Sequence, residues 1–136
     1  MSHSDDDDPL KELEIDRDKY DRERMADVLK QLVRIDQETG EPVKMEYFDD
    51  LDSRRRIVAL LLARRAAHSL DLISESEVGM TSGELSDHAG AAGSTIRRYA
   101  SDKLSFVENE SDNSGYYIPR HKIKEAVDFL EEGKNN

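Results

Sequence analysis

The chain of 136 residues has no cysteine, which excludes a disulfide scaffold, a thiolate metal site and a redox role for a thiol. Long apolar runs are also missing. The longest, at 57–63, is far shorter than the roughly 20 residues that a membrane-spanning helix needs. The N-terminus lacks the apolar core of a secretion signal. We therefore expect a soluble, cytoplasmic protein that does not enter a membrane.

Patterns typical of catalysis and metal binding are scarce as well. The four histidines show no paired ligand spacing. The stretch GAAGS at 90–94 is superficially like a phosphate-binding loop, but it lacks the preceding strand and the Lys-Ser/Thr ending. No group of side chains has the make-up of a catalytic site. We predict no enzyme activity, no cofactor and no metal.

Basic residues are in deficit: 20 Lys and Arg stand against 31 Asp and Glu, a formal net charge of −11. This acidic composition, with 12 Arg to 8 Lys, resembles that of proteins from salt-accumulating archaea. The alternative is an ordinary acidic protein with an acidic tail. The acidity is uneven, since residues 1–80 hold 21 acids and 13 bases while residues 81–136 hold 10 acids and 7 bases.

The N-terminal third divides into a tail and a helix. Residues 1–17 are an acidic tail that has little to bury, and we expect it to be disordered. Within 18–50, a helix is predicted over about 18–35, because apolar residues recur there at the spacing of an amphipathic helix: Met25, Val28, Leu29, Leu32 and Val33. A short extended segment follows, in which the alternating residues are Val43, Met45 and Tyr47. Two roles stay open for the helix, pairing with a second copy in a homodimer or packing on the next helix.

A second helix is predicted to run to about Leu70, with its N-cap at Asp50, Asp52 or Ser53. It is apolar over most of its circumference, so we place it at the centre of the domain. Its basic residues are interpreted as a solvated face that balances nearby acids: Arg54, Arg55, Arg56, Arg64 and Arg65.

The stretch TSGELSDHAGAAGSTIRRYASDKL, at 81–104, has the spacing of two short helices joined by a tight turn. Thr81 and Glu84 form a capping box, with Met80 and Leu85 placed as a hydrophobic staple. Gly90 supplies the left-handed residue that such a turn needs. The apolar positions around it are Leu85, Ala89, Ala91, Ile96 and Tyr99. The N-cap of the second of these helices is either Ala92, a poor capping residue, or Ser94.

This pattern resembles the helix-turn-helix of winged-helix transcription regulators of archaea, including STIRRY at 94–99. Ser86 departs from the family, which usually has Ala there. The flanks extend the resemblance: LSFVENE at 104–110 and YYIP at 116–119 predict a β-hairpin, the wing, and a helix follows over about 120–132. The fold expected is mainly α with a small β-hairpin, a winged helix-turn-helix over 51–132 with an extra N-terminal helix.

The resemblance implies sequence-specific binding of double-stranded DNA, with the second helix of the motif in the major groove. The residues expected on its outward side or at its ends are Ser94, Thr95, Arg97, Arg98, Ser101 and Lys103. Either arginine has the donor geometry for guanine O6 and N7, and Ser94, Thr95 and Lys103 suit phosphate. In multimolar salt, distant carboxylates would scarcely repel DNA. The wing carries Glu108, Glu110 and Asp112, and this leaves a protein-interaction module without DNA binding as the alternative.

Overall fold

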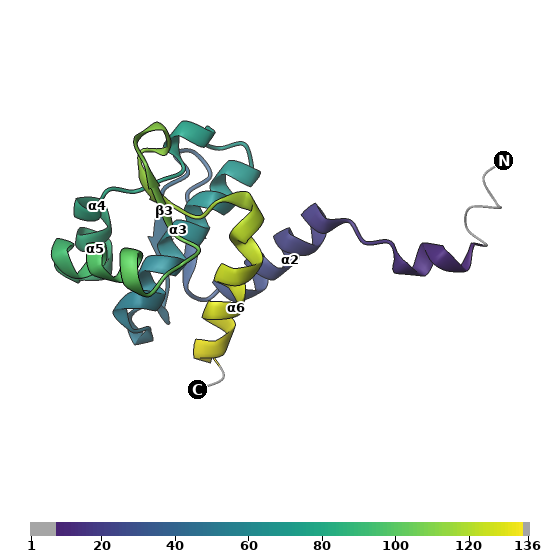
Figure 1. Cartoon of the computed structure of the whole chain (residues 1–136), viewed down its shortest axis with the longest axis horizontal. Helices are drawn as coiled ribbons and strands as arrows, with labels where there is room; N and C mark the ends of the chain where they lie inside the picture. The colour runs from purple at the N-terminus through teal and green to yellow at the C-terminus, as the bar shows by residue number, and fades with distance from the viewer. Residues whose placement is uncertain (1–7, 135–136) are drawn as a thin grey trace.

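Helix α3 (Ser53–Ser69) is the centre of the fold in the computed structural model, which describes residues 8–134 (Figure 1). Asp52 caps its start, where the carboxylate accepts a hydrogen bond from the backbone N–H of Arg55 at 2.9 Å. Every residue from Ile57 to Ala63 is buried, because helices and strands pack on this helix from several sides. The predicted central helix is thereby confirmed.

The arginines of α3 do not form a solvated face, and that prediction was wrong. Arg65 is only 1% exposed. Its guanidinium donates to the backbone oxygen of Ile118 at 2.9 Å and to both carboxylate oxygens of Glu75, at 2.8 and 3.0 Å. The other four arginines are partly buried. Arg56 and Arg64 donate to backbone oxygens of other segments, and Arg55 donates to Asp52 at the start of its own helix, while long side chains of this kind cover apolar surface with their stems.

The N-terminal helix α2 (Arg17–Leu29) is shorter than predicted. Residues 33–35, expected as its last turn, form strand β1 (Val33–Ile35), which pairs antiparallel with β2 (Pro42–Lys44). Leu32 and Val33 are both buried, as the predicted helical pattern required, but Leu32 lies in a turn and Val33 lies in strand β1. The β-branched residues of β1 favour a strand, and pairing with β2 decides the outcome. The extended segment is confirmed only as far as Lys44, in β2, because the chain then forms a turn and the 3-10 helix η2 (Phe48–Asp50). Val43, Met45 and Tyr47 are all exposed.

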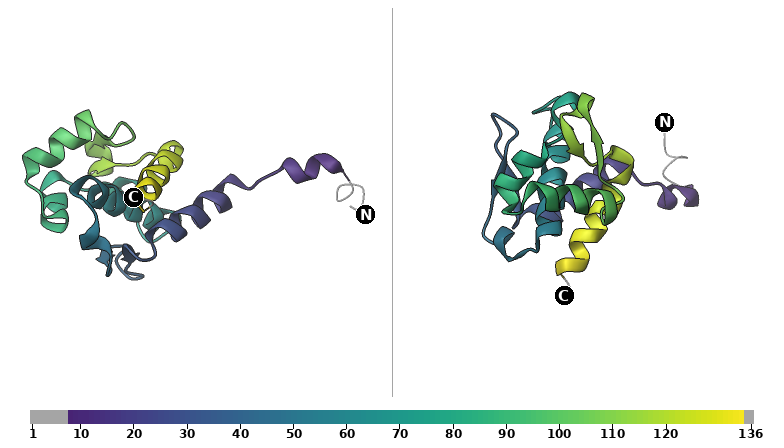
Figure 2. Two further views of the ribbon diagram at one scale, coloured as in Figure 1. Left: turned by 90° about the horizontal axis from the view of Figure 1, so that it is seen from below. Right: turned by 60° about the vertical axis from the view of Figure 1, so that its left-hand side comes forward.

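Before α2 the chain extends away from the body as an arm (Figure 1, and both views of Figure 2). Its residues Pro9–Leu13 form the 3-10 helix η1, none of whose residues is buried. The tail predicted over residues 1–17 therefore contains one helical segment, and its first seven residues lie outside the described part of the chain.

The C-terminal half contains the helix pair α4 (Ser82–Ala89) and α5 (Gly93–Asp102), followed by an antiparallel hairpin of β3 (Glu108–Glu110) and β4 (Gly115–Tyr117). Met80 pairs with Tyr116 of β4 through two backbone hydrogen bonds, at 2.8 and 2.9 Å. The short segment before α4 thus joins the edge of the hairpin.

The predicted final helix is present as α6 (Ile123–Lys134), preceded by the 3-10 turn η5 (Arg120–Lys122). It packs on α3 and α2, and Arg24 of α2 donates to Asp128 at 2.8 Å and to Glu131 at 2.9 Å. A mainly helical fold with a small β-hairpin is therefore confirmed, and a second hairpin, β1–β2, is added to it.

Candidate nucleic-acid interface

The start of α4 has the predicted capping box. The Thr81 hydroxyl accepts a hydrogen bond from the backbone N–H of Glu84 at 3.1 Å, and the Glu84 carboxylate accepts one from the N–H of Thr81 at 2.9 Å. Leu85 is fully buried, and Met80 is 3% exposed. The backbone N–H groups of Thr81 and Glu84 therefore each have a side-chain acceptor, and this reciprocal pair fixes where α4 begins.

The turn between α4 and α5 has the predicted geometry. Gly90 ends α4 in the left-handed region, with φ 74° and ψ 22°, where a side chain is strained. Two cations from other elements hold the carbonyl end of α4: Arg56 donates to the backbone oxygen of Ala89 at 3.1 Å, and Lys44 to that of His88 at 3.4 Å. The end of α4, from which the turn leads into α5, is therefore held by contacts from α3 and β2.

Helix α5 begins at Gly93, with Ala92 as N-cap, so the cap does not shift to Ser94. Ala92 has no side-chain hydrogen bond to offer, and the first N–H groups of the helix lack a side-chain acceptor. On the inner side, Ile96 is fully buried, and Tyr99 and Ala100 are partly buried. Helix α5 is thus anchored along one side only.

The predicted site residues lie on the outer side or at the ends of α5. Thr95 is partly buried, and the others are exposed: Ser94, Arg97, Arg98, Ser101 and Lys103. Within residues 8–134, none of the three bases forms an ion pair. Arg97 makes a long contact of 3.4 Å to the Ser82 hydroxyl, and Arg98 lies 5.4 Å from the centre of the Tyr99 ring. The guanidinium groups therefore keep most of their donors for a ligand.

Ser101 fits the site less well than the other predicted residues. Its hydroxyl lies 3.1 Å from the backbone oxygen of Arg98 and 3.1 Å from the Asp102 carboxylate, and its one proton goes to one of these acceptors. The oxygen remains an acceptor, and the carboxylate beside it is unfavourable for a phosphate.

The sequence did not indicate Arg54 as part of this surface. Its guanidinium lies 5.8 Å from the centre of the Tyr99 ring, which Arg98 also approaches, so that two cations share one aromatic side chain. Arg54 is in the first turn of α3, and α3 and α5 meet only through tertiary packing. No spacing along the chain signals this neighbourhood.

The hairpin tip is docked against η3 (Glu75–Glu77). Asn113 donates to the Glu75 carboxylate at 2.9 Å, and the Ser114 hydroxyl donates to the backbone oxygen of Ser76 at 2.5 Å. In Figure 1 the tip lies above α4 and α5.

The surface of the β3–β4 hairpin is acidic. Glu110 and Asp112 are exposed, whereas Glu108 pairs with Lys122 at 3.3 Å. Burial and the nearby Glu108 raise the pKa of Tyr117. This hairpin thus presents carboxylates where a DNA-contacting wing usually presents bases.

Two further findings bear on function. No helix in residues 8–134 is both long and apolar enough to span a bilayer. Comparison of the chain with protein-family models, with curated proteins and with solved structures returned no match. Function is therefore inferred from α5 and its surroundings.

Proposed function

We propose that residues 51–132 form a winged helix-turn-helix and that the protein binds duplex DNA sequence-specifically as a transcription regulator. The order of elements supports this proposal: helix α3, the Met80 segment that joins the hairpin, helices α4 and α5, and then the hairpin itself. In such an arrangement the second helix of the motif enters the major groove. Helix α5 takes that role here.

One observation carries the proposal: Arg97 and Arg98 are exposed on the outer side of a firmly positioned helix, and neither pairs with a described carboxylate. A planar guanidinium donates two parallel hydrogen bonds to guanine O6 and N7, which discriminates bases by about 1 to 3 kcal/mol.

The ends of α5 suit phosphate. Its first backbone N–H groups have no side-chain cap, and Ser94 and Thr95 add hydroxyl groups beside them. Lys103, at the other end of the helix, is exposed. Phosphate contacts at both ends would fix the register of α5 along the groove.

The net charge of −11 opposes DNA binding at low salt. In a salt-adapted archaeal cytoplasm this opposition is weak, because the Debye length is about 3 Å at 1 M salt. Counterion release then adds little, and short-range contacts to bases carry the affinity. We include a salt-adapted cytoplasm in the proposal for this reason.

The experiment selects a binding site from a random duplex library and measures affinity for it from about 0.1 to 3 M KCl. The Arg97→Ala plus Arg98→Ala protein should bind at least about tenfold more weakly, because two base contacts are lost. A matched control, Arg17→Ala plus Arg120→Ala, removes the same charge from two exposed arginines elsewhere and should retain binding. Full binding by the α5 variant would remove both arginines from the mechanism.

The acidic hairpin tip favours a second candidate, a winged helix that binds a basic protein segment. Glu110 and Asp112 are exposed, and the residues that follow at the tip are held by η3, so the acids occupy a fixed surface. Failure to select any duplex at any salt concentration would favour this candidate over DNA binding.

A further inference from the structure

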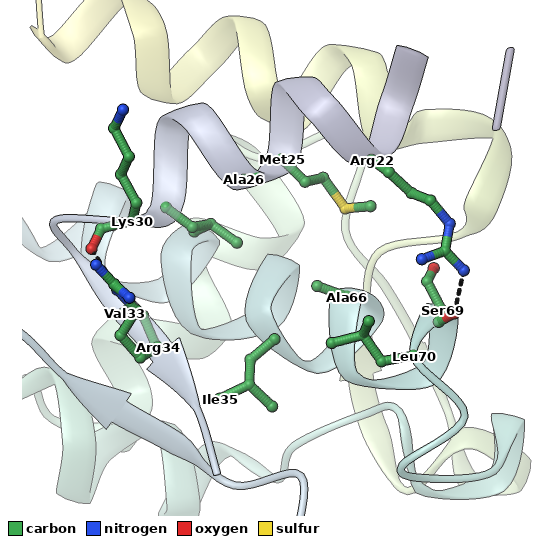
Figure 3. A pocket seen from close by; sticks show the side chains of 11 residues that line it. Arg22, Met25, Ala26, Lys30, Val33, Arg34, Ile35, Ala66, Ser69 and Leu70 are labelled. Atoms are coloured by element: carbon green, nitrogen blue, oxygen red, sulfur yellow. Dashed lines mark hydrogen bonds between the residues drawn. The ribbon is translucent and has the colours of Figure 1, made fainter. Parts of the chain in front are cut away.

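An apolar groove lies between α2, β1 and the end of α3 (Figure 3). Its volume is about 420 Å³. Its apolar lining comes from all three elements: Met25, Leu29, Val33, Ile35, Ala66 and Leu70. Leu70 is 53% exposed, and Ile35 and Ala66 are partly exposed. Part of the apolar lining of the groove is therefore exposed to water.

The rim of the groove is basic. Arg22, Lys30 and Arg34 lie around it, and no acid belongs to its lining (Figure 3). Arg22 is held by Asp18 at 3.0 Å and by the backbone oxygen of Ser69, whereas Lys30 and Arg34 make no ion pair with a described residue. The rim therefore carries two positive charges that are unpaired within residues 8–134, those of Lys30 and Arg34, on a chain of net charge −11. It favours an occupant that is both apolar and acidic.

The arm before α2 has that chemistry. Leu10, Leu13 and Ile15 are 65%, 76% and 67% exposed, the three highest values among the large apolar residues described. Leu10 and Leu13 share one side of η1, because residues three apart are eclipsed in a 3-10 helix. Over residues 8–16 there is one base, Lys11, against four acids: Asp8, Glu12, Glu14 and Asp16.

We infer that the groove receives the arm of a second copy of this chain, so that two molecules exchange arms across a two-fold axis. The arm leaves the start of α2 pointing away from the body (Figures 1 and 2), whereas the groove is lined by residues within 22–35 and 66–70. The arm would therefore have to reverse direction at Asp16 to reach its own groove. A partner's arm needs no such reversal. The exchange buries Leu13 and Ile15 on the apolar lining and sets the arm's carboxylates beside the basic rim. Both contacts are identical, as a closed dimer requires.

The test measures the mass of the full chain by sedimentation equilibrium over a range of concentrations. The natural protein should dimerise. Leu13→Ser plus Ile15→Ser should weaken dimerisation at least about tenfold, because two apolar side chains lose their burial. These residues are exposed within one chain, so the substitutions leave its fold intact, as circular dichroism would verify. The matched control is Val43→Ser plus Tyr47→Ser, which removes two apolar residues that are 45% and 46% exposed elsewhere. It should dimerise like the natural protein.

A second variant alters the groove instead of the arm. Lys30→Glu plus Leu70→Glu reverses one rim charge and places another carboxylate on the apolar lining. It should also dimerise at least about tenfold more weakly, yet mixing it with the arm variant should give a heterodimer, because one intact arm then meets one intact groove. A natural protein that stays monomeric at every concentration would overturn the inference. So would an arm variant that dimerises as strongly as the natural protein, or a mixture that forms no heterodimer.

Discussion

The arginines of α3 and those of α5 are the same residue type in opposite surroundings. Arg65 of α3 is 1% exposed and donates to one backbone oxygen and one carboxylate, whereas Arg97 and Arg98 of α5 are exposed and pair with no described acid. Both helices carry adjacent arginines in the sequence, at 54–56 and 64–65 in one and at 97–98 in the other. The difference teaches that neighbouring elements, more than local sequence, decide whether an arginine supports the fold or faces a ligand.

The physical cause is the number of sides on which each helix packs. Helix α3 has neighbours on several sides, so the donors of Arg56, Arg64 and Arg65 meet backbone oxygens of other segments. Helix α5 is buried along the side of Ile96 alone. Its arginines therefore meet water, and the donors remain open to a polar partner.

The largest effect expected from this comparison is on stability. Arg65→Ala should lower the free energy of unfolding by about 3 kcal/mol, because it empties a buried site and removes three hydrogen bonds, two of them to a carboxylate. Arg98→Ala should change it by less than about 0.5 kcal/mol, as at other exposed positions. Urea unfolding followed by circular dichroism measures both values.

A conservative variant sharpens this prediction. Arg65→Lys keeps the positive charge but not the planar fork that reaches Glu75 and Ile118 together, so it should recover only part of the lost stability. Equal stabilities for Arg65→Ala and Arg98→Ala would break the comparison between the two helices.

A smaller effect on stability is expected from pH, through the carboxyl group that pairs with the same buried arginine. The hydrogen bond from Arg65 lowers the pKa of Glu75 below its ordinary value of 4.5, with a further contribution from the positive charge of that arginine. Since the pKa is lower in the folded state, the stabilisation is present above about pH 4.5 and is lost as the pH falls through the folded-state pKa.

Glu75→Gln therefore should cost less stability than Arg65→Ala, since the Glu75 side chain is 49% exposed, and its cost should shrink below pH 4.5. Urea unfolding of both proteins between about pH 3 and 7 tests this dependence. A cost that stays constant over that range would show that the carboxylate charge contributes nothing.

Local signals predicted the helix pair and its surroundings well. The capping box of Thr81 and Glu84, the left-handed Gly90 and the hairpin after α5 each depend on a few neighbouring residues, and the structure confirms them. The strands of the hairpin are shorter than predicted, at 108–110 and 115–117 instead of 104–110 and 116–119. The predicted end of α2 was wrong because the helical spacing of apolar residues continued into residues that form β1 and pair with β2. Pairing across a turn is decided by contacts that periodicity does not record.

Some features of the candidate site could likewise be predicted from local sequence, and others could not. Which residues of α5 face outward followed from the apolar positions around Ile96. That Arg54 approaches Tyr99, and that Arg65 is buried against Glu75, depend on how distant elements pack. An arginine on a helix that packs on several sides has no sequence pattern that separates it from a solvated one, and the predicted solvated face failed for this reason.

The smallest effect concerns the uncapped start of α5. Ala92 has the extended backbone of an N-cap, with φ −63° and ψ 147°, so Ser or Asp there should stabilise the fold by about 0.5 to 1 kcal/mol. The two substitutions should differ in DNA binding, because only Asp sets a negative charge where a phosphate is proposed to bind. At the lowest salt concentration where the natural protein binds, duplex affinity should therefore fall for Ala92→Asp and much less for Ala92→Ser, while urea unfolding shows similar gains for both. Equal affinities for the two variants would show that no phosphate binds at the N-terminus of α5, and would leave the proposed contacts to its arginines and Lys103.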